Sequence, residues 1–172
     1  MDRQHKDPNF VLPPSEYLPE GFKLHIDHKT TSKKSYLLPP SDAEIDRLHI
    51  QHYSTRQIVH GNFNAPVEED LETGIKVLDA GCGSGIWTIE MAEDYPNSTF
   101  VGIDIADMYP KTGDLPPNVR FLKANILEGL PFEDGKFDYV FQRFLIFDLS
   151  PGDWKVAIKE LARLVKPGYV GS

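Results

Sequence analysis

The clearest indication of a chemical function in this chain comes from glycines and carboxylates that follow two short apolar segments. The apolar segment 75–80 runs into Gly81, Gly83 and Gly85, and a second apolar segment ends at Asp104. A buried strand followed by a glycine-rich turn and a helix is typical of a site for a nucleoside ligand. A carboxylate about 20 residues later can accept hydrogen bonds from both ribose hydroxyls. The spacing therefore predicts a cofactor site.

The glycine spacing distinguishes between two kinds of cofactor. A dinucleotide fingerprint reads G-x-G-x-x-G. Here Gly81, Gly83 and Gly85 read G-x-G-x-G, and Ile86 stands where the third glycine of that fingerprint would be. This spacing disfavours a pyrophosphate and leaves a dehydrogenase as the weaker alternative.

The turn also begins with a carboxylate, Asp79. With it, the turn resembles the D/E-x-G-x-G-x-G motif of class I S-adenosylmethionine-dependent methyltransferases. The resemblance implies that Asp79 lies near the methionine ammonium and that the start of the following helix faces the methionine carboxylate, since its N–H groups are unpaired. Cys82, inside the turn, is expected to be a small residue lining the ligand and not a reactive thiol.

Later segments resemble further signatures of the same family, in the family's order: 101–104, 118–121, 130–132, 137–140 and 164–168. Other segments are similar to the fungal LaeA-like methyltransferase-domain proteins: 36–39, 46–48, 51–52, 85–87 and 153–154. The superfamily resemblance covers residues 75–168, and the fungal one begins near residue 36.

The resemblance implies further cofactor contacts. Ile105 would pack on the adenine face, Asn125 would bind the adenine amino group, and the Ile126 amide would face the ring. Gln142 and Arg143 would lie beside the methionine and the acceptor. For Asn125 a role as a turn residue at a strand end remains an equal alternative, and for Arg143 a surface ion pair is favoured over catalysis.

The implied activity is methyl transfer from S-adenosylmethionine to an unidentified acceptor, either a small molecule or a protein. The methyl group is already activated, so the protein mainly aligns the acceptor and excludes water. No catalytic residue is assigned; Tyr36, His49, His52 and Tyr53 lie on a segment that could cover the site and receive no role. Segment 142–145 lacks the N/D-P-P-Y/F signature of methyltransferases acting on adenine or glutamine amino groups, which disfavours those acceptors.

The elements expected around this site alternate between strand and helix. Expected strands are 75–80, 99–104, 119–124 and 137–142, and expected helices are 42–60, 85–94 and 151–165. This order predicts an α/β fold, a Rossmann-like parallel sheet with helices on both faces, preceded by an N-terminal helix. Segment 61–74 is expected to be a polar connection. Three regions follow: a disordered or loosely docked tail at 1–34, a helical lid segment and linker at 35–74, and the cofactor domain at 75–172.

Local patterns predict how these helices begin and which faces they bury. Ser41 with Glu44, and Ser150 with Pro151, are helix-start signals. The inward residues are expected to be Ile86, Ile89 and Ala92 in one helix, and Val156, Ile158 or Leu161, and Leu164 or Val165 in the other.

The resemblance implies seven strands, of which four to five are expected here, so the domain is expected to be truncated. Strand 137–142 would then present Phe137, Tyr139 and Phe141 at an unprotected edge, which a protein partner could cover. The alternative function is a cofactor-binding or interaction module without independent catalysis. Its candidate contact surface is the run 144–147, for which burial beneath the last helix is the favoured alternative.

Composition limits the remaining classes. The 172 residues are 40% hydrophobic and 26% charged with a formal net charge of -8, as in one ordinary globular domain. Without a Lys/Arg-rich face, nucleic acid is an unlikely partner. No apolar run reaches the ~18 residues of a membrane span and no signal peptide is evident, so we expect an intracellular protein, cytoplasmic or nuclear. Cys82 is the single cysteine, which excludes an internal disulfide and a cysteine-based metal cluster; no metal is expected.

Overall fold

The structure, a computed structural model, describes residues 41–111, 113 and 115–171. The tail predicted at 1–34 and the first part of the lid segment, including Tyr36, lie outside the described residues.

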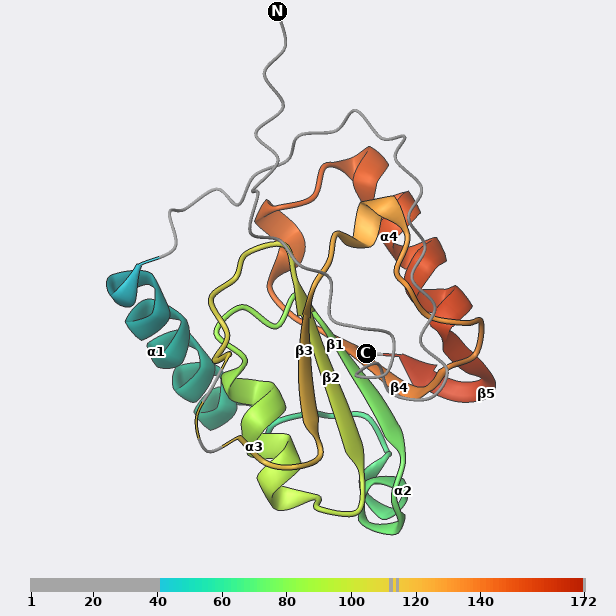
Figure 1. Cartoon of the computed structure of the whole chain (residues 1–172), viewed down its shortest axis with the longest axis horizontal. Helices are drawn as coiled ribbons and strands as arrows, with labels where there is room; N and C mark the ends of the chain where they lie inside the picture. The colour runs from blue at the N-terminus through green and yellow to red at the C-terminus, as the bar shows by residue number, and fades with distance from the viewer. Residues whose placement is uncertain (1–40, 112, 114, 172) are drawn as a thin grey trace, which may run out of the picture.

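The described residues form one parallel sheet of five strands in the order β3-β2-β1-β4-β5, seen nearly edge-on in Figure 1. The strands are β1 (Lys76–Ala80), β2 (Thr99–Asp104), β3 (Val119–Lys123), β4 (Phe137–Gln142) and β5 (Val165–Gly171). The first four lie within one residue of the predicted ranges at each end. The Rossmann-like sheet, with its reversal of order at β1, is therefore confirmed.

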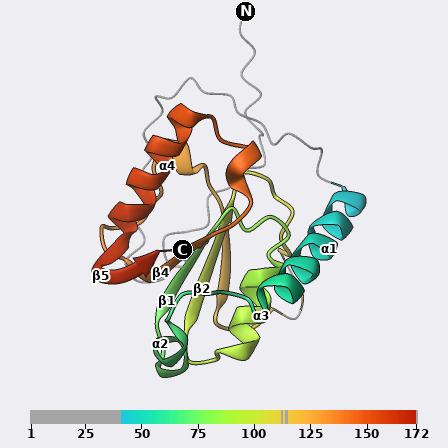
Figure 2. The ribbon, with the colours of Figure 1, turned by 180° about the vertical axis from the view of Figure 1, so that it is seen from behind.

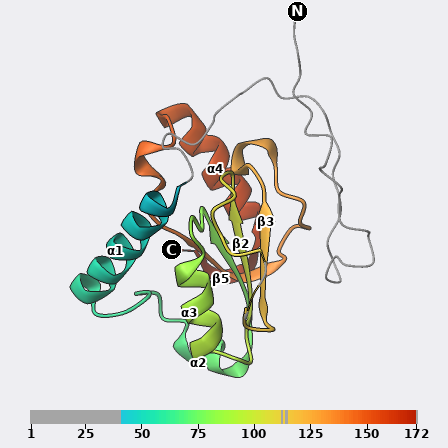
Figure 3. The same cartoon turned by 60° about the vertical axis from the view of Figure 1, so that its left-hand side comes forward.

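Helices cover both faces of this sheet, as Figures 1 and 2 show from opposite sides. The helices are α1 (Asp42–Val59), α2 (Glu68–Thr73), α3 (Ile86–Asp94) and α4 (Pro151–Leu164), with short 3-10 helices η2 (Ile126–Glu128) and η3 (Leu145–Phe147). Helices α2 and α3 share one core with the sheet, and α4 shares the other. Helix α1 lies outside α3, as the turned view in Figure 3 shows.

Alternation along the strands divides the core into these two layers. In β1, Val77 belongs to the core beneath α3, whereas Leu78 and Ala80 belong to the core beneath α4. Trp87 on α3 stacks on Phe141 of β4, with ring centroids 3.9 Å apart. This packing fixes α3, and hence the turn that precedes it, against the middle of the sheet.

The predicted helix starts are confirmed. The Ser41 hydroxyl accepts a hydrogen bond from the Glu44 N–H at 3.2 Å. Ser150 and Asp153 form a reciprocal capping box at the start of α4, with Pro151 in its first turn. Helix α2 was not predicted, because its N-terminal residue Val67 offers no side-chain cap and the six-residue helix buries only one of its own residues.

The predicted inward faces are partly wrong. In α3 the buried residues are Trp87, Thr88, Met91 and Ala92, whereas Ile86 and Ile89 are half-buried. In α4 the buried residues are Ala157 and Leu164, whereas Val156 and Ile158 are 48% and 59% exposed. In each helix the buried residues form a narrow stripe that faces the sheet, and the four predicted β-branched residues lie beside this stripe and not within it.

The expected open edge at β4 is also wrong. Helix α4 ends at Leu164, and β5 follows at once, pairing Phe137 with Val165 and Tyr139 with Val170. Phe137, Tyr139 and Phe141 are all buried. The favoured burial of run 144–147 beneath the last helix is wrong for Phe144 and Ile146, which are 43% and 67% exposed.

Candidate functional site

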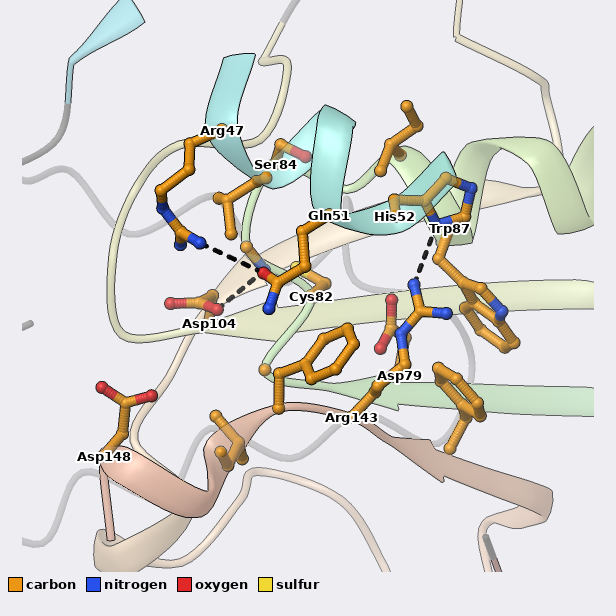
Figure 4. A pocket seen from close by; sticks show the side chains of 17 residues that line it. Arg47, Gln51, His52, Asp79, Cys82, Ser84, Trp87, Asp104, Arg143 and Asp148 are labelled. Atoms are coloured by element: carbon orange, nitrogen blue, oxygen red, sulfur yellow. Dashed lines mark hydrogen bonds between the residues drawn. The ribbon is translucent and has the colours of Figure 1, made fainter. Parts of the chain in front are cut away.

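The turn between β1 and α3 lies where the carboxyl ends of β1, β2 and β4 meet, beneath α1 (Figures 3 and 4). Gly81, Gly83 and Gly85 have φ angles of 83°, 55° and 77°, in the left-handed region that favours glycine. A Cβ at Gly85 would lie 2.6 Å from the Phe121 ring of β3. Glycine is thus required both for the backbone conformation of the turn and for the close packing of α3 against β3.

Asp104, at the end of β2, holds this turn in place through hydrogen bonds. Its two carboxylate oxygens accept from the N–H groups of Gly83 at 2.8 Å and Ala106 at 2.7 Å. Burial raises the pKa of Asp104, and the two backbone hydrogen bonds oppose that rise. Each oxygen keeps a further lone pair, so this carboxylate can still accept hydrogen bonds from a ligand in the cavity.

Asp79, near the end of β1, is a buried carboxylate at the floor of the site (Figure 4). The Thr88 hydroxyl donates to it at 2.6 Å. Burial raises the pKa of Asp79 from 3.8 to about 7, while Thr88 and the positive charge of Arg143 oppose the rise. A buried carboxylate with so high a pKa gains from any cation placed beside it.

The Ser84 hydroxyl, in the same turn, is buried and has no hydrogen-bond partner. Among the described residues only the Asn62 side-chain oxygen shares that condition. Ser84 lines the cavity, and a buried hydroxyl without a partner is costly unless a ligand or solvent supplies one. Among the described residues no group satisfies this hydroxyl, so it is free to bind a polar group of a ligand.

These residues enclose a cavity of about 440 Å³, a size typical of small-molecule sites. Half of the predicted cofactor residues line it: Asp79, Gly81, Cys82, Gly83 and Asp104. Burial raises the pKa of the Cys82 thiol, which disfavours a thiolate.

The other predicted cofactor residues do not line the cavity. Gly85 sits at the start of α3, and Ile105 and Gln142 each adjoin a lining residue. Asn125 caps η2, where its side-chain oxygen accepts from the Leu127 N–H at 3.0 Å. Its amide group donates to Glu128. These contacts are those of a turn residue at a strand end, the alternative role that the sequence left open for Asn125. Ile126 lies within the same short helix.

The sequence predicted that this helix could cover the site, but it did not identify the side chains of α1 that form one wall of the cavity. This wall consists of Arg47, Leu48, Gln51 and His52, drawn together in Figure 4. A Cβ at Gly83 would lie 3.3 Å from a Leu48 methyl group, so α1 lies directly over the glycine turn. Segments 46–48 and 51–52, which belong to the LaeA-like pattern, were the signal that could have identified these side chains.

Residues after β4 form the opposite wall. Arg143 donates to the His52 ring at 2.8 Å and is half-buried, so the surface ion pair favoured in the sequence is wrong. Phe144 and Leu145 also line the cavity. Phe144 has φ of 65°, a strained angle for a side chain of this size.

The strand order, the glycine turn and the carboxylate after β2 define a Rossmann-like nucleoside-binding domain. Residues 77–168 match the family described as methyltransferase domain, and the chain belongs to that family. The match confirms the resemblance to class I methyltransferases and supports S-adenosylmethionine as the cofactor.

Several curated fungal proteins are similar to this chain. Methyltransferase str3 of Strobilurus tenacellus is 36% identical over 77% of this chain and 46% of its own length. N-methyltransferase verN of Clonostachys rogersoniana is 33% identical over 80% of this chain and 48% of its own. Secondary metabolism regulator LAE1 of Cochliobolus heterostrophus is 37% identical over 77% and 43%. The chain thus spans less than half the length of each of these relatives.

Solved structures share the fold. A putative methyltransferase in complex with the Haloferax volcanii Trm112 methyltransferase activator has a TM-score of 0.58 at 24% identity, over 76% of this chain and 55% of that one. PH0226 of Pyrococcus horikoshii has a TM-score of 0.50 at 26% identity, over 73% and 56%. Within the part of the chain that the structure describes, no helix could cross a membrane and no cluster of metal-ligating side chains occurs.

Proposed function

We propose that this chain binds S-adenosylmethionine in the cavity beneath α1 and serves methyl transfer to an acceptor. The observation that carries the proposal is the pairing of a glycine turn with two buried carboxylates, Asp79 and Asp104, in one cavity. When bound, the cofactor would supply a methyl group activated on a sulfonium.

Each polar group of the cavity suits one part of this cofactor. Asp104 would accept hydrogen bonds from the ribose hydroxyls through its remaining lone pairs. Asp79 would face the methionine ammonium, because a cation relieves the burial that raises its pKa. Ser84 would gain the hydrogen-bond partner that it lacks.

The apolar side chains around the cavity would exclude water from the methyl group. Leu48 on α1 covers the turn, while Phe141, Phe144 and Leu145 supply apolar surface around the cavity. This enclosure would favour an acceptor aligned behind the methyl group over hydrolysis. The acceptor would be either a small molecule or a protein side chain.

Calorimetric titration with S-adenosylmethionine, and separately with NAD, tests this proposal. We expect saturable binding of the first alone. Asp104→Asn should weaken it by about 1.5–3 kcal/mol, since an amide nitrogen cannot replace a carboxylate oxygen as an acceptor. Urea unfolding of the same variant is needed, because Asp104 also holds the backbone of Gly83 and Ala106.

Two further variants separate binding from folding. Ser84→Ala removes a hydroxyl that has no partner among the residues that the structure describes, so it should leave stability unchanged or higher while weakening cofactor binding. Asp134→Ala removes an exposed carboxylate outside the cavity and should leave binding unchanged. Equal binding by the parent chain, Ser84→Ala and Asp104→Asn would contradict the proposed site.

A further inference from the structure

His52 is the one buried imidazole of α1, and both of its ring nitrogens are engaged. It is 2% exposed. Its Nε2 lies 2.9 Å from a carboxylate oxygen of Glu90 on α3, and its Nδ1 lies 2.8 Å from a guanidinium nitrogen of Arg143. Figure 4 shows the contact to Arg143 at the cavity wall. One ring therefore joins α1, α3 and the segment after β4.

These two contacts determine the proton positions on the ring. A guanidinium can only donate, so Nδ1 of His52 must accept from Arg143. The ring proton then lies on Nε2 and is donated to Glu90. A second proton on Nδ1 would oppose the donor of Arg143 and place two cations in contact, so the arrangement requires a neutral imidazole.

Arg143 is a half-buried cation whose pKa is lowered by burial, while the charges of Asp79 and Glu90 oppose that fall. Its guanidinium lies over the rings of Phe141 and Phe144, at 5.6 and 5.1 Å from their centroids. None of the ion pairs within the described residues includes it. Its positive charge lowers the pKa of Asp79 across the cavity. The orientation of Arg143 thus affects the electrostatics of the whole site.

One further side chain of α1 and one that follows the helix contact the same Glu90 of α3. Arg56 and Asn62 donate to the same Glu90 oxygen, at 3.1 and 3.2 Å. Several apolar side chains of α1 point to solvent instead of into the fold: Ile50, Tyr53, Ile58 and Val59. The Glu90 cluster, with His52 at its centre, therefore attaches α1 to α3 beside the glycine turn.

We propose that His52, as the neutral Nε2–H imidazole, is a positioning residue that orients the Arg143 guanidinium and holds α1 in place over the cavity. Protonation of His52 would break its hydrogen bond from Arg143 and weaken the docking of α1. The consequence for the cofactor rests on the proposed function. The role of His52 in docking α1 does not depend on that function.

The groups that face His52 determine the direction of its pH response. Burial lowers the pKa of His52, Glu90 from α3 opposes this, and Arg143 and Arg56 add to it. The folded pKa is therefore below the ordinary value of 6.5. As the pH falls below that value, an undocked imidazole takes up a proton more readily than the docked one, so the docking of α1 weakens.

Nitrogen NMR of the full chain with labelled histidine, without cofactor, tests the proton positions directly. We expect His52 to be the neutral Nε2–H tautomer at pH 7 and to protonate only below 6.5, together with faster hydrogen exchange of the α1 amides. A charged ring, the Nδ1–H tautomer, or protonation without faster exchange would overturn the inference. None of these readouts requires the cofactor, so absence of cofactor binding contradicts only the proposed function.

Variants test the consequence for binding. His52→Ala should speed α1 exchange at every pH and weaken S-adenosylmethionine binding by about threefold to tenfold. His52→Gln keeps one acceptor and one donor but does not titrate, so it should restore part of the affinity and remove the acid-dependent exchange. His49→Gln, on the same helix but outside the cavity, is the matched control. A parental exchange profile in His52→Ala would refute the positioning role.

Discussion

Asp79→Asn should change folding and cofactor binding in opposite directions. Burial raises the folded-state pKa of Asp79 from 3.8 to about 7. The folded state therefore holds the proton more tightly than the unfolded state, and stability is lost as the pH rises between these values. Asparagine keeps an oxygen that can accept from Thr88 and carries no charge, so it removes this loss.

The magnitude follows from the same two pKa values. One pKa unit corresponds to about 1.4 kcal/mol, so this raised pKa lowers the free energy of unfolding by about 4 kcal/mol at pH 8 and by about 2 kcal/mol at pH 5.5, where the unfolded chain is ionised and the folded one keeps the proton. We expect Asp79→Asn to raise the free energy of unfolding by up to these amounts. The same variant should bind S-adenosylmethionine more weakly, because the ammonium loses its carboxylate.

Urea unfolding at the two pH values, without cofactor, measures the first effect, and calorimetry measures the second. Asp138→Asn is the matched control on β4: Asp138 is also buried, but it accepts from the Lys76 N–H and pairs with Lys166, so its replacement should destabilise the fold. The reasoning is refuted if Asp79→Asn fails to stabilise the chain, or if its gain does not grow between pH 5.5 and 8.

Three further substitutions test the framework around the site. Gly85→Ala should destabilise the chain by about 2–4 kcal/mol, since it combines a positive φ with a clash against Phe121; Gly135→Ala, which also has a positive φ but whose Cβ would meet nothing closer than 3.7 Å, should cost only about 1–2 kcal/mol, and equal losses in urea unfolding would contradict the clash. Ser98→Ala should cost about 1–3 kcal/mol, because its hydroxyl joins the Leu71 carbonyl to the Ile75 N–H; a loss below 0.5 kcal/mol in the same assay would count against that bridge. Ser150→Ala should lower stability by about 1 kcal/mol through the capping box of α4, and thermal unfolding that matches the parent would show the cap to be dispensable.

Local sequence signals were sufficient for the first four strands and for five of the residues that line the cavity. The glycine turn and Asp104 could be predicted because a strand, a tight turn and a carboxylate at fixed spacing impose one geometry. Strand and helix boundaries followed from apolar runs and from caps such as Ser41 and Ser150, whose action is local. Asp79 and Cys82 were found because they flank or belong to the same turn.

The missed features depend on contacts between distant segments. The roles of Leu48 and His52 require knowledge that α1 lies over α3, which no local pattern in α1 supplies. Arg143 was expected at the surface because its partner, His52, is 91 residues away. The pairing of β5 with β4 was missed because a short segment after Lys166-Pro167-Gly168 has no distinctive pattern of its own.

The most direct measurement is an experimental structure of the chain with S-adenosylhomocysteine, the demethylated cofactor. We predict that its ribose hydroxyls lie within hydrogen-bond distance of Asp104, that its ammonium lies beside Asp79, and that Ser84 contacts it. A ligand bound outside this cavity, or a folded chain that takes up none, would contradict the assignment of this cavity as the cofactor site.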